Sequence, residues 1–96
     1  MISAETAKAN VINYQAAFFA EVTATVTEIL NSMSRSIEFH SKSGLSSAVF
    51  MPYTSSRFSS DRAKEIAHEQ FKKAFETAGY EIIANDTERN ILSIKW

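Results

Sequence analysis

The chain has 96 residues, no cysteine and a formal net charge of −1 at pH 7. This length fits one domain, and the lack of cysteine excludes disulfides and thiolate metal sites. A near-neutral charge disfavours nucleic-acid binding, which normally needs an excess of basic residues along the phosphates. The start of the chain carries Glu5 rather than the bases of a signal peptide, and no apolar run approaches the ~18 residues of a membrane span. We therefore expect a cytoplasmic protein with no membrane contact.

The first half of the sequence predicts one long amphipathic helix, from about residue 4 to residue 43. Ser3 is a suitable N-cap, Glu5 places an acid in the first turn, and no Gly or Pro occurs before Gly44. Apolar residues recur at heptad spacing, at Ile12, Phe19, Val26 and Met33. The short polar side chains of residues 31–36 compete with the backbone for hydrogen bonds, so a break there is the alternative.

The second half predicts four shorter elements. An apolar run within residues 45–53 is of strand length and is stopped by Pro52. Residues 61–78 carry an apolar stripe at helical spacing that ends at Gly79. Residues 80–84 and 91–96 read as a hairpin, and Leu92, Ile94 and Trp96 alternate onto its core face. The expected fold class is α+β: a long N-terminal helix, then β-α-β-β with a small antiparallel sheet packed on the second helix.

Side chains that could do chemistry are present but form no recognised motif. His40 and His68 lie on different helices outside any HxxxH pair, and we expect both to be solvated or to cap a helix. The only two glycines are placed as helix ends, which excludes a glycine-rich phosphate loop. No GxSxG turn accompanies the many serines. We therefore expect no catalytic residue, no metal and no cofactor, and hence no enzyme.

One loop and the start of the helix after it are candidates for a binding site. Tyr53, Arg57, Phe58 and Arg62 place two aromatic rings and two guanidinium groups within ten residues. Aromatic residues and arginine are enriched where proteins bind proteins, and arginine beside an aromatic ring can also hold a base or a phosphate. The alternative is that Phe58 anchors the second helix to the core and the arginines are solvated.

The length of the first helix predicts self-association. A helix of ~40 residues is ~60 Å long, whereas a compact chain of this size is roughly 32 Å across. About half of the helix should therefore overhang the rest. Its apolar side chains are more than a monomer normally leaves in water, so we expect a homo-oligomer, most simply a two-fold dimer. The predicted interface consists of Val11, Ile12, Tyr14, Phe18, Phe19, Val22 and Val26.

The C-terminal residues carry a resemblance to a known group of proteins. Residues 71–82 form a helix end followed by a Gly79-Tyr80 step, and residues 91–96 form a strand that ends in Ile94-Lys95-Trp96. With the long N-terminal helix, this pattern is similar to small uncharacterised proteins encoded by tailed bacteriophages. The Ser- and Phe-rich residues 32–60 depart most from that pattern. The resemblance implies a phage accessory protein in the bacterial host cytoplasm or a minor particle component, and it supplies no site residues.

These observations lead to a functional expectation with two alternatives. We expect a non-enzymatic, self-associating accessory protein that binds and modulates a host or phage protein, with counter-defence among the processes it could serve. The first alternative is a minor structural or assembly component of a virion. The second is nucleic-acid binding through the loop that holds Arg57 and the helix that begins near Arg62.

Overall fold

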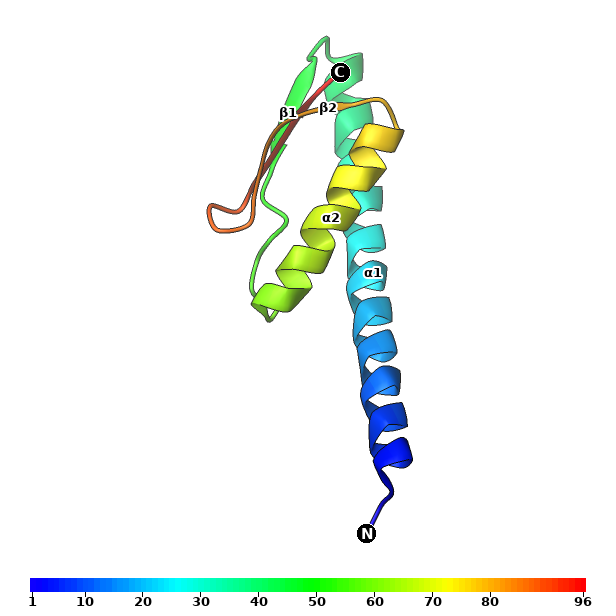
Figure 1. The fold of residues 1–96 in the computed structure, drawn as a ribbon. Helices are drawn as coiled ribbons and strands as arrows, with labels where there is room; N and C mark the ends of the chain where they lie inside the picture. Colours follow the sequence, from blue (N-terminus) through cyan, green and yellow to red (C-terminus); the bar gives the residue numbers. More distant parts are fainter.

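A computed structural model describes all 96 residues and shows two helices and three strands (Figure 1). In chain order they are α1 (Ala4–Lys42), β1 (Ser47–Phe50), α2 (Asp61–Thr77), β2 (Glu81–Asp86) and β3 (Ile91–Lys95). The expected α+β class, with a long N-terminal helix and a small antiparallel sheet, is confirmed.

The first helix, α1, is unbroken over its whole length. The Ser3 side chain accepts a hydrogen bond from the Thr6 amide at its start, which satisfies a free N–H of the first turn. The serine-rich residues 31–36 do not interrupt it, because Met33 and Ile37 pack into the core while the serines lie mainly on the outer side. The helix ends at Lys42, and Gly44 just beyond it has a φ of +85°.

The second helix, α2, is capped at both ends by its own sequence. Ser60 accepts a hydrogen bond from the Ala63 amide at the N-terminus. At the C-terminus the Tyr80 amide donates to the Phe75 carbonyl at 3.0 Å, while Gly79 takes φ +90°. The Tyr80 ring then packs edge-on against Phe75, the contact expected beyond a helix that ends this way.

The sheet has the order β1-β3-β2, and both outer strands run antiparallel to β3. β1 is shorter than the predicted strand of residues 45–53, because the chain leaves the ladder before Pro52. The Tyr53 amide donates instead to the Asn90 side chain, in the turn between β2 and β3. A register shift between Ile82 and Ala84 places a bulge in β2.

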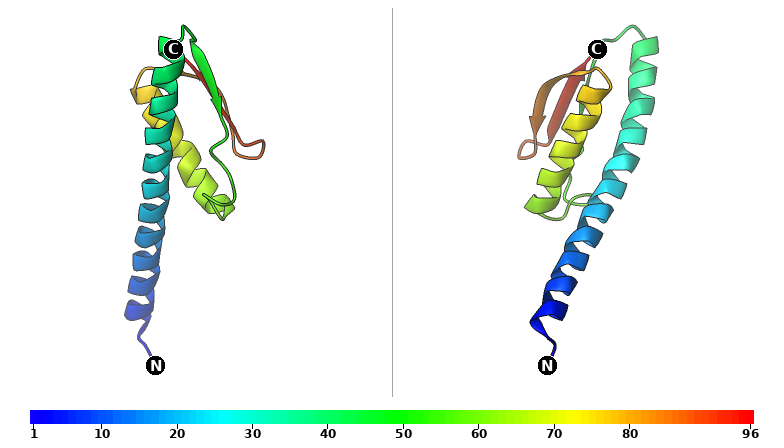
Figure 2. Two further views of the ribbon diagram at one scale, coloured as in Figure 1. Left: turned by 180° about the vertical axis from the view of Figure 1, so that it is seen from behind. Right: turned by 45° about the vertical axis from the view of Figure 1, so that its right-hand side comes forward.

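The two helices form one layer and the sheet forms the other, and the core lies between them (Figure 2). Alternate residues of the strands face the helices, and Leu92 and Ile94 of β3 are completely buried. The prediction placed Trp96 on this face as well. It lies just past β3 and is 37% exposed, with its ring edge-on to Tyr80 at 6.1 Å. It therefore closes the margin of the core rather than filling it.

The molecule is elongated because α1 extends beyond everything else (Figures 1 and 2). Its extents are 64 × 23 × 20 Å and its radius of gyration is 16.6 Å, compared with ~12 Å for a compact chain of this length. We call residues Ala4–Phe19 of α1 the overhang, since every side chain in this range is exposed except Ala7 and Phe18, which are half-buried. The overhang is about two-fifths of α1, less than the predicted half, because Val22 and Val26 are already buried in the core.

Candidate interaction surface

The overhang carries a stripe of apolar side chains that points towards the same side as the core. Val11 precedes the buried Val22 by eleven residues, about three helical turns, and Ile12 and Phe19 precede the buried Val26 at heptad spacing. These side chains therefore continue the core-facing stripe of α1 beyond the last element that covers it. Exposure along the stripe is high, reaching 64% at Ile12, 70% at Tyr14 and 53% at Phe19.

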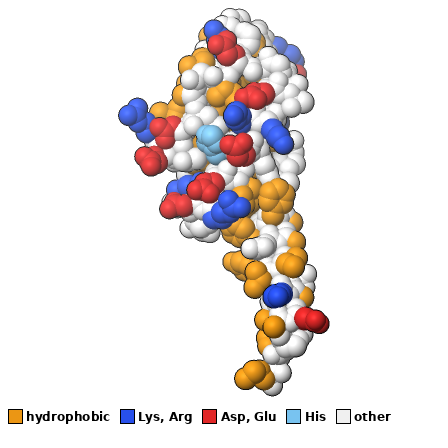
Figure 3. All heavy atoms as spheres, in the orientation of Figure 1, with side chains coloured by type: hydrophobic (Ala, Val, Ile, Leu, Met, Phe, Trp, Pro, Cys, Tyr) orange, Lys and Arg blue, Asp and Glu red, His pale blue; other side chains and the backbone are white.

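Charge is almost absent from the overhang. Its only ionisable acid and base are Glu5 and Lys8, so its net charge is zero. The helix α2 and the β2–β3 turn beside it are densely charged, and Figure 3 shows this contrast directly. A helix that normally faces water carries charged residues on most of its surface. The overhang therefore lacks the charged face that is typical of a solvent-exposed helix.

The predicted interface divides into two groups in the structure. Val11, Ile12, Tyr14 and Phe19 are exposed, and the half-buried Phe18 stacks on Tyr14 with ring centroids 6.3 Å apart. Val22 and Val26 are 5% and 2% exposed and belong to the monomer core, which corrects their assignment to an interface. The heptad pattern could not separate these two groups, because the exposed residues and the core residues lie on the same apolar stripe of α1.

The loop predicted as a binding site does not present its aromatic rings to solvent. Tyr53 and Phe58 are 2% and 1% exposed and pack on Phe71 of α2, which corrects the reading of these two rings as binding side chains. The two arginines diverge: Arg57 lies 3.5 Å from Glu28 on α1, while Arg62 lies 3.4 Å from a glutamate one turn along α2. The four residues therefore form no common surface.

Tyr53 is instead the centre of a polar cluster between α2 and the hairpin. Its hydroxyl donates to the Asn85 side-chain oxygen, and the His68 ring stacks on its ring at 6.4 Å. Nε2–H of His68 donates to the Asn85 carbonyl at 2.9 Å, so this histidine is half-buried and structural rather than solvated as expected. Burial raises the pKa of the Tyr53 hydroxyl well above its usual value. His40, near the end of α1, donates from Nδ1 to the Ser36 carbonyl at 2.6 Å.

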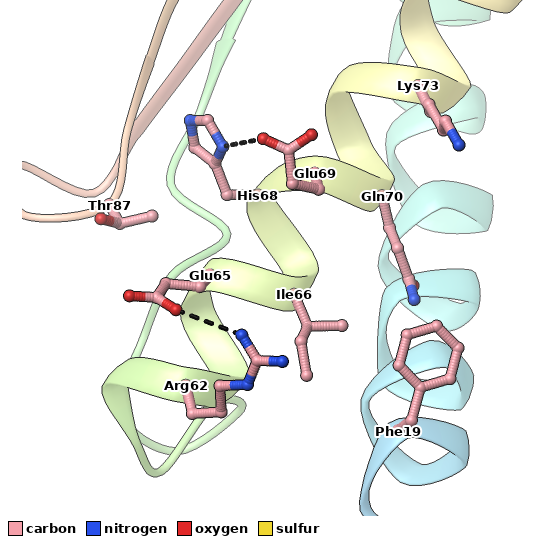
Figure 4. A pocket seen from close by; sticks show the side chains of 9 residues that line it. All are labelled: Phe19, Arg62, Glu65, Ile66, His68, Glu69, Gln70, Lys73 and Thr87. Carbon is pink, nitrogen blue, oxygen red and sulfur yellow. Dashed lines mark hydrogen bonds and ion pairs between the residues drawn. The ribbon is translucent and has the colours of Figure 1, made fainter. Parts of the chain in front are cut away.

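Two shallow hollows meet where the overhang leaves the base of α2. The lower one, of about 560 Å³, we call the corner; it is lined by Tyr14, Gln15, Phe18, Phe19, Ser60, Arg62 and Ile66. The upper one, of about 690 Å³, shares Phe19, Arg62 and Ile66 with the corner and runs along the outer side of α2. Figure 4 shows Phe19 on α1 and Ile66 on α2 bordering the same space, with Arg62 turned towards Glu65. The corner therefore combines an apolar floor with one guanidinium group.

A second apolar surface, on the outer face of the sheet, was not predicted. Val49, Met51 and Ile83 are all more than half exposed there, because their neighbours in β1 and β2 take the inward positions. Alternation within the run Ala48-Val49-Phe50-Met51 could have shown that one of each pair must face outward.

Comparison of the chain with known protein families, curated proteins and solved structures finds no match. No group of three or more histidine, cysteine, aspartate or glutamate side chains is placed to hold a metal ion. No helix is both long enough and apolar enough to cross a membrane.

Proposed function

We propose that this chain is a non-enzymatic protein-binding domain that works as a homo-oligomer assembled through the overhang. One observation carries the proposal: the apolar stripe of α1 that packs into the core continues along the overhang, where Val11, Ile12, Tyr14 and Phe19 are each more than half exposed. Burying one large apolar side chain stabilises a complex by about 1.5–3 kcal/mol, and the overhang exposes several. Exposed apolar patches of this kind mark interaction sites in natural proteins.

The shape of the monomer also supports self-association. A chain of this length has a small core, and this chain places about a sixth of its residues in a helix that contributes little to it. An oligomer would give that helix a packing partner and so offset the conformational entropy lost in ordering it. We propose an accessory role, in which the oligomer binds and modulates another protein. A phage context and a counter-defence role remain predictions from the sequence resemblance.

Nucleic-acid binding has less support than protein binding. The two arginines proposed to contact phosphates lie apart, and each is within ion-pair distance of a glutamate. A mobility-shift experiment at ~50 mM salt tests this alternative, since phosphate contacts weaken steeply as salt is added. We expect no shift. A place in the virion is tested by mass spectrometry of purified particles.

Light scattering after gel filtration tests self-association. We expect a mass above that of one 10.7 kDa chain at ~50 µM, falling on dilution. Phe19→Asp should reduce the mass to that of the monomer, because it places a carboxylate against an apolar partner surface. The matched control is Val49→Asp, a similar change at an exposed site on the sheet, which should leave the mass unchanged. A single-chain mass for the unaltered protein at this concentration would contradict the proposal.

A further inference from the structure

The direction of the exposed stripe limits how two copies can meet. α2 and the sheet lie on one side of α1, directly beyond the end of the overhang (Figures 1 and 2). The stripe faces that same side, because its helical spacing continues that of the buried Val22 and Val26. If two overhangs faced each other with their chains parallel, α2 and the sheet of both copies would have to occupy the space between the same two helices. With the chains antiparallel, these parts lie at opposite ends and do not meet. The stripe is therefore accessible to a second copy only in the antiparallel direction.

The start of α2 limits the length of the contact between the two overhangs. The stripe becomes buried at Val22, so a partner helix can cover it only as far as Phe19. Two overhangs of about 16 residues then overlap along ~24 Å, with the two-fold axis between Val11 and Ile12. In this register Val11 of one copy packs on Ile12 of the other. The start of each α1 reaches the corner of its partner.

The charges of the overhang agree with this register. Glu5 precedes Ile12 and Phe19 at heptad spacing and so lies on the same stripe. The antiparallel register places Glu5 opposite Phe18 of the second copy, and Phe18 and Arg62 line the same corner. Arg62 is exposed and pairs with Glu65 at 3.4 Å, and an exposed ion pair of this kind contributes so little stability that Glu5 of the second copy can compete for the guanidinium. In this register Glu5, the only acid of the overhang, therefore lies near Arg62 of the second copy, at the end of the contact between the two helices.

We propose that the occupant of the corner and the stripe is the overhang of a second copy, which runs antiparallel and places Glu5 against Arg62 of its partner. The inference rests on the proposed self-association and adds its geometry. Each two-fold dimer contains this contact twice, because such an interface is isologous. A seam of this length is short for a stable interface, so the dimer should dissociate and re-form readily with concentration.

Charge reversal tests the contact. Glu5→Arg and Arg62→Glu should each weaken dimerisation about tenfold or more, because each change sets like charges together at both ends of the seam. The double variant Glu5→Arg/Arg62→Glu should restore most of the affinity. Neither site is buried, so folding is preserved, and circular dichroism checks this. Lys72→Glu, a reversal at another exposed site on α2, is the matched control and should not change the dissociation constant.

A distance measurement tests the direction of the chains. The protein has no cysteine, so Asn31→Cys, an exposed site on α1, accepts a single spin label. The antiparallel register predicts ~60 Å between the two labels, whereas parallel helices would hold them within ~30 Å. A dimer with the short distance, or one that the double charge reversal does not restore, overturns the antiparallel seating while self-association stands. A chain that is monomeric and instead floats with phosphatidylcholine or phosphatidylglycerol vesicles overturns both proposals.

Discussion

At the scale of single residues, this protein uses its aromatic side chains mainly for packing. Phe71 is fully buried at the point where α2 meets the loop rings of Tyr53 and Phe58, with edge-on contacts of 5.8 and 6.4 Å. Such edge-on contacts stabilise the fold beyond the transfer free energy of each ring. The cluster packs the serine-rich loop that holds Tyr53 and Phe58 against the helix that follows it.

Replacing Phe71 by Ala should therefore lower the free energy of unfolding by about 3–5 kcal/mol, as cavity-forming changes at buried phenylalanines do. Phe39→Ala, at an exposed site on α1, is the matched control and should change it by less than ~0.5 kcal/mol. Urea unfolding measures both. If Phe71→Ala prevents folding, Phe71→Leu provides a smaller loss that remains measurable. Equal effects at the two sites would show that the face of α2 is assigned wrongly.

The buried hydroxyl of Tyr53 makes stability depend on alkaline pH. Burial raises the pKa of this hydroxyl in the folded state above its ordinary value of 10.0. The stability it contributes is present in full below pH ~10 and is lost as the pH rises from there towards the folded-state pKa, because only the unfolded chain releases the proton. Tyr53→Phe should remove this alkaline loss. It should also cost about 1–3 kcal/mol at pH 7, because Asn85 loses its hydrogen-bond donor.

Thermal unfolding between pH 7 and pH 11 measures both effects of Tyr53→Phe. Tyr14→Phe, at a site that is 70% exposed, is the control and should keep the neutral-pH stability of the unaltered protein. A Tyr53→Phe variant that loses stability above pH 10 as steeply as the unaltered protein would contradict the assignment of the alkaline loss to this hydroxyl.

At the scale of elements, both helices end at a glycine that no other residue replaces without strain. Gly44 and Gly79 have φ of +85° and +90°, and a Cβ added at either would meet no atom within 4 Å. The strain of a side chain there would therefore come from the backbone conformation alone. In both turns the amide three residues beyond the last helical residue donates to a carbonyl of the last turn: Leu45 to His40 and Tyr80 to Phe75.

Gly79→Ala should consequently destabilise the protein by about 1–2 kcal/mol, the cost of the left-handed conformation for a residue with a Cβ. Gly79→Asn should cost less, because asparagine tolerates this region better. Ala78→Gly, one residue earlier with φ −80°, is the matched control. It should lower the free energy of unfolding by less than Gly79→Ala, because it introduces no left-handed conformation for a residue with a Cβ. Urea unfolding measures all three. No loss for Gly79→Ala would mean that α2 ends elsewhere in solution.

At the scale of the whole molecule, the overhang decides the dimensions of any assembly. Two molecules 64 Å long that overlap antiparallel along ~24 Å extend to about 100 Å. Parallel packing would leave the length of the dimer close to that of the monomer. Small-angle X-ray scattering at a concentration where light scattering shows the dimer should therefore give a maximum dimension near 100 Å. A maximum near 65 Å for the dimer would contradict the antiparallel arrangement.

The helices, the strands and much of the overhang follow from the amino-acid pattern alone. Local signals were sufficient where capping and periodicity act within a few residues, as at Ser3 and Gly79. The exposed members of the predicted interface, such as Ile12 and Phe19, follow from helix length compared with the size of the remaining chain. These predictions use only the helical rise of 1.5 Å per residue and the spacing of hydrophobic residues, so they need no knowledge of tertiary contacts.

Which apolar residues are covered depends on tertiary packing. Val26 and Phe19 share one heptad position, yet Val26 is packed into the core and is 2% exposed, while Phe19 borders the corner at the start of α2 and is 53% exposed. Tyr53 and Arg57 lie in one loop, yet packing buries the ring and turns the guanidinium towards α1. A periodic pattern identifies only the apolar face of a helix. Whether a residue on that face is buried depends on which segments, distant in the chain, pack against it.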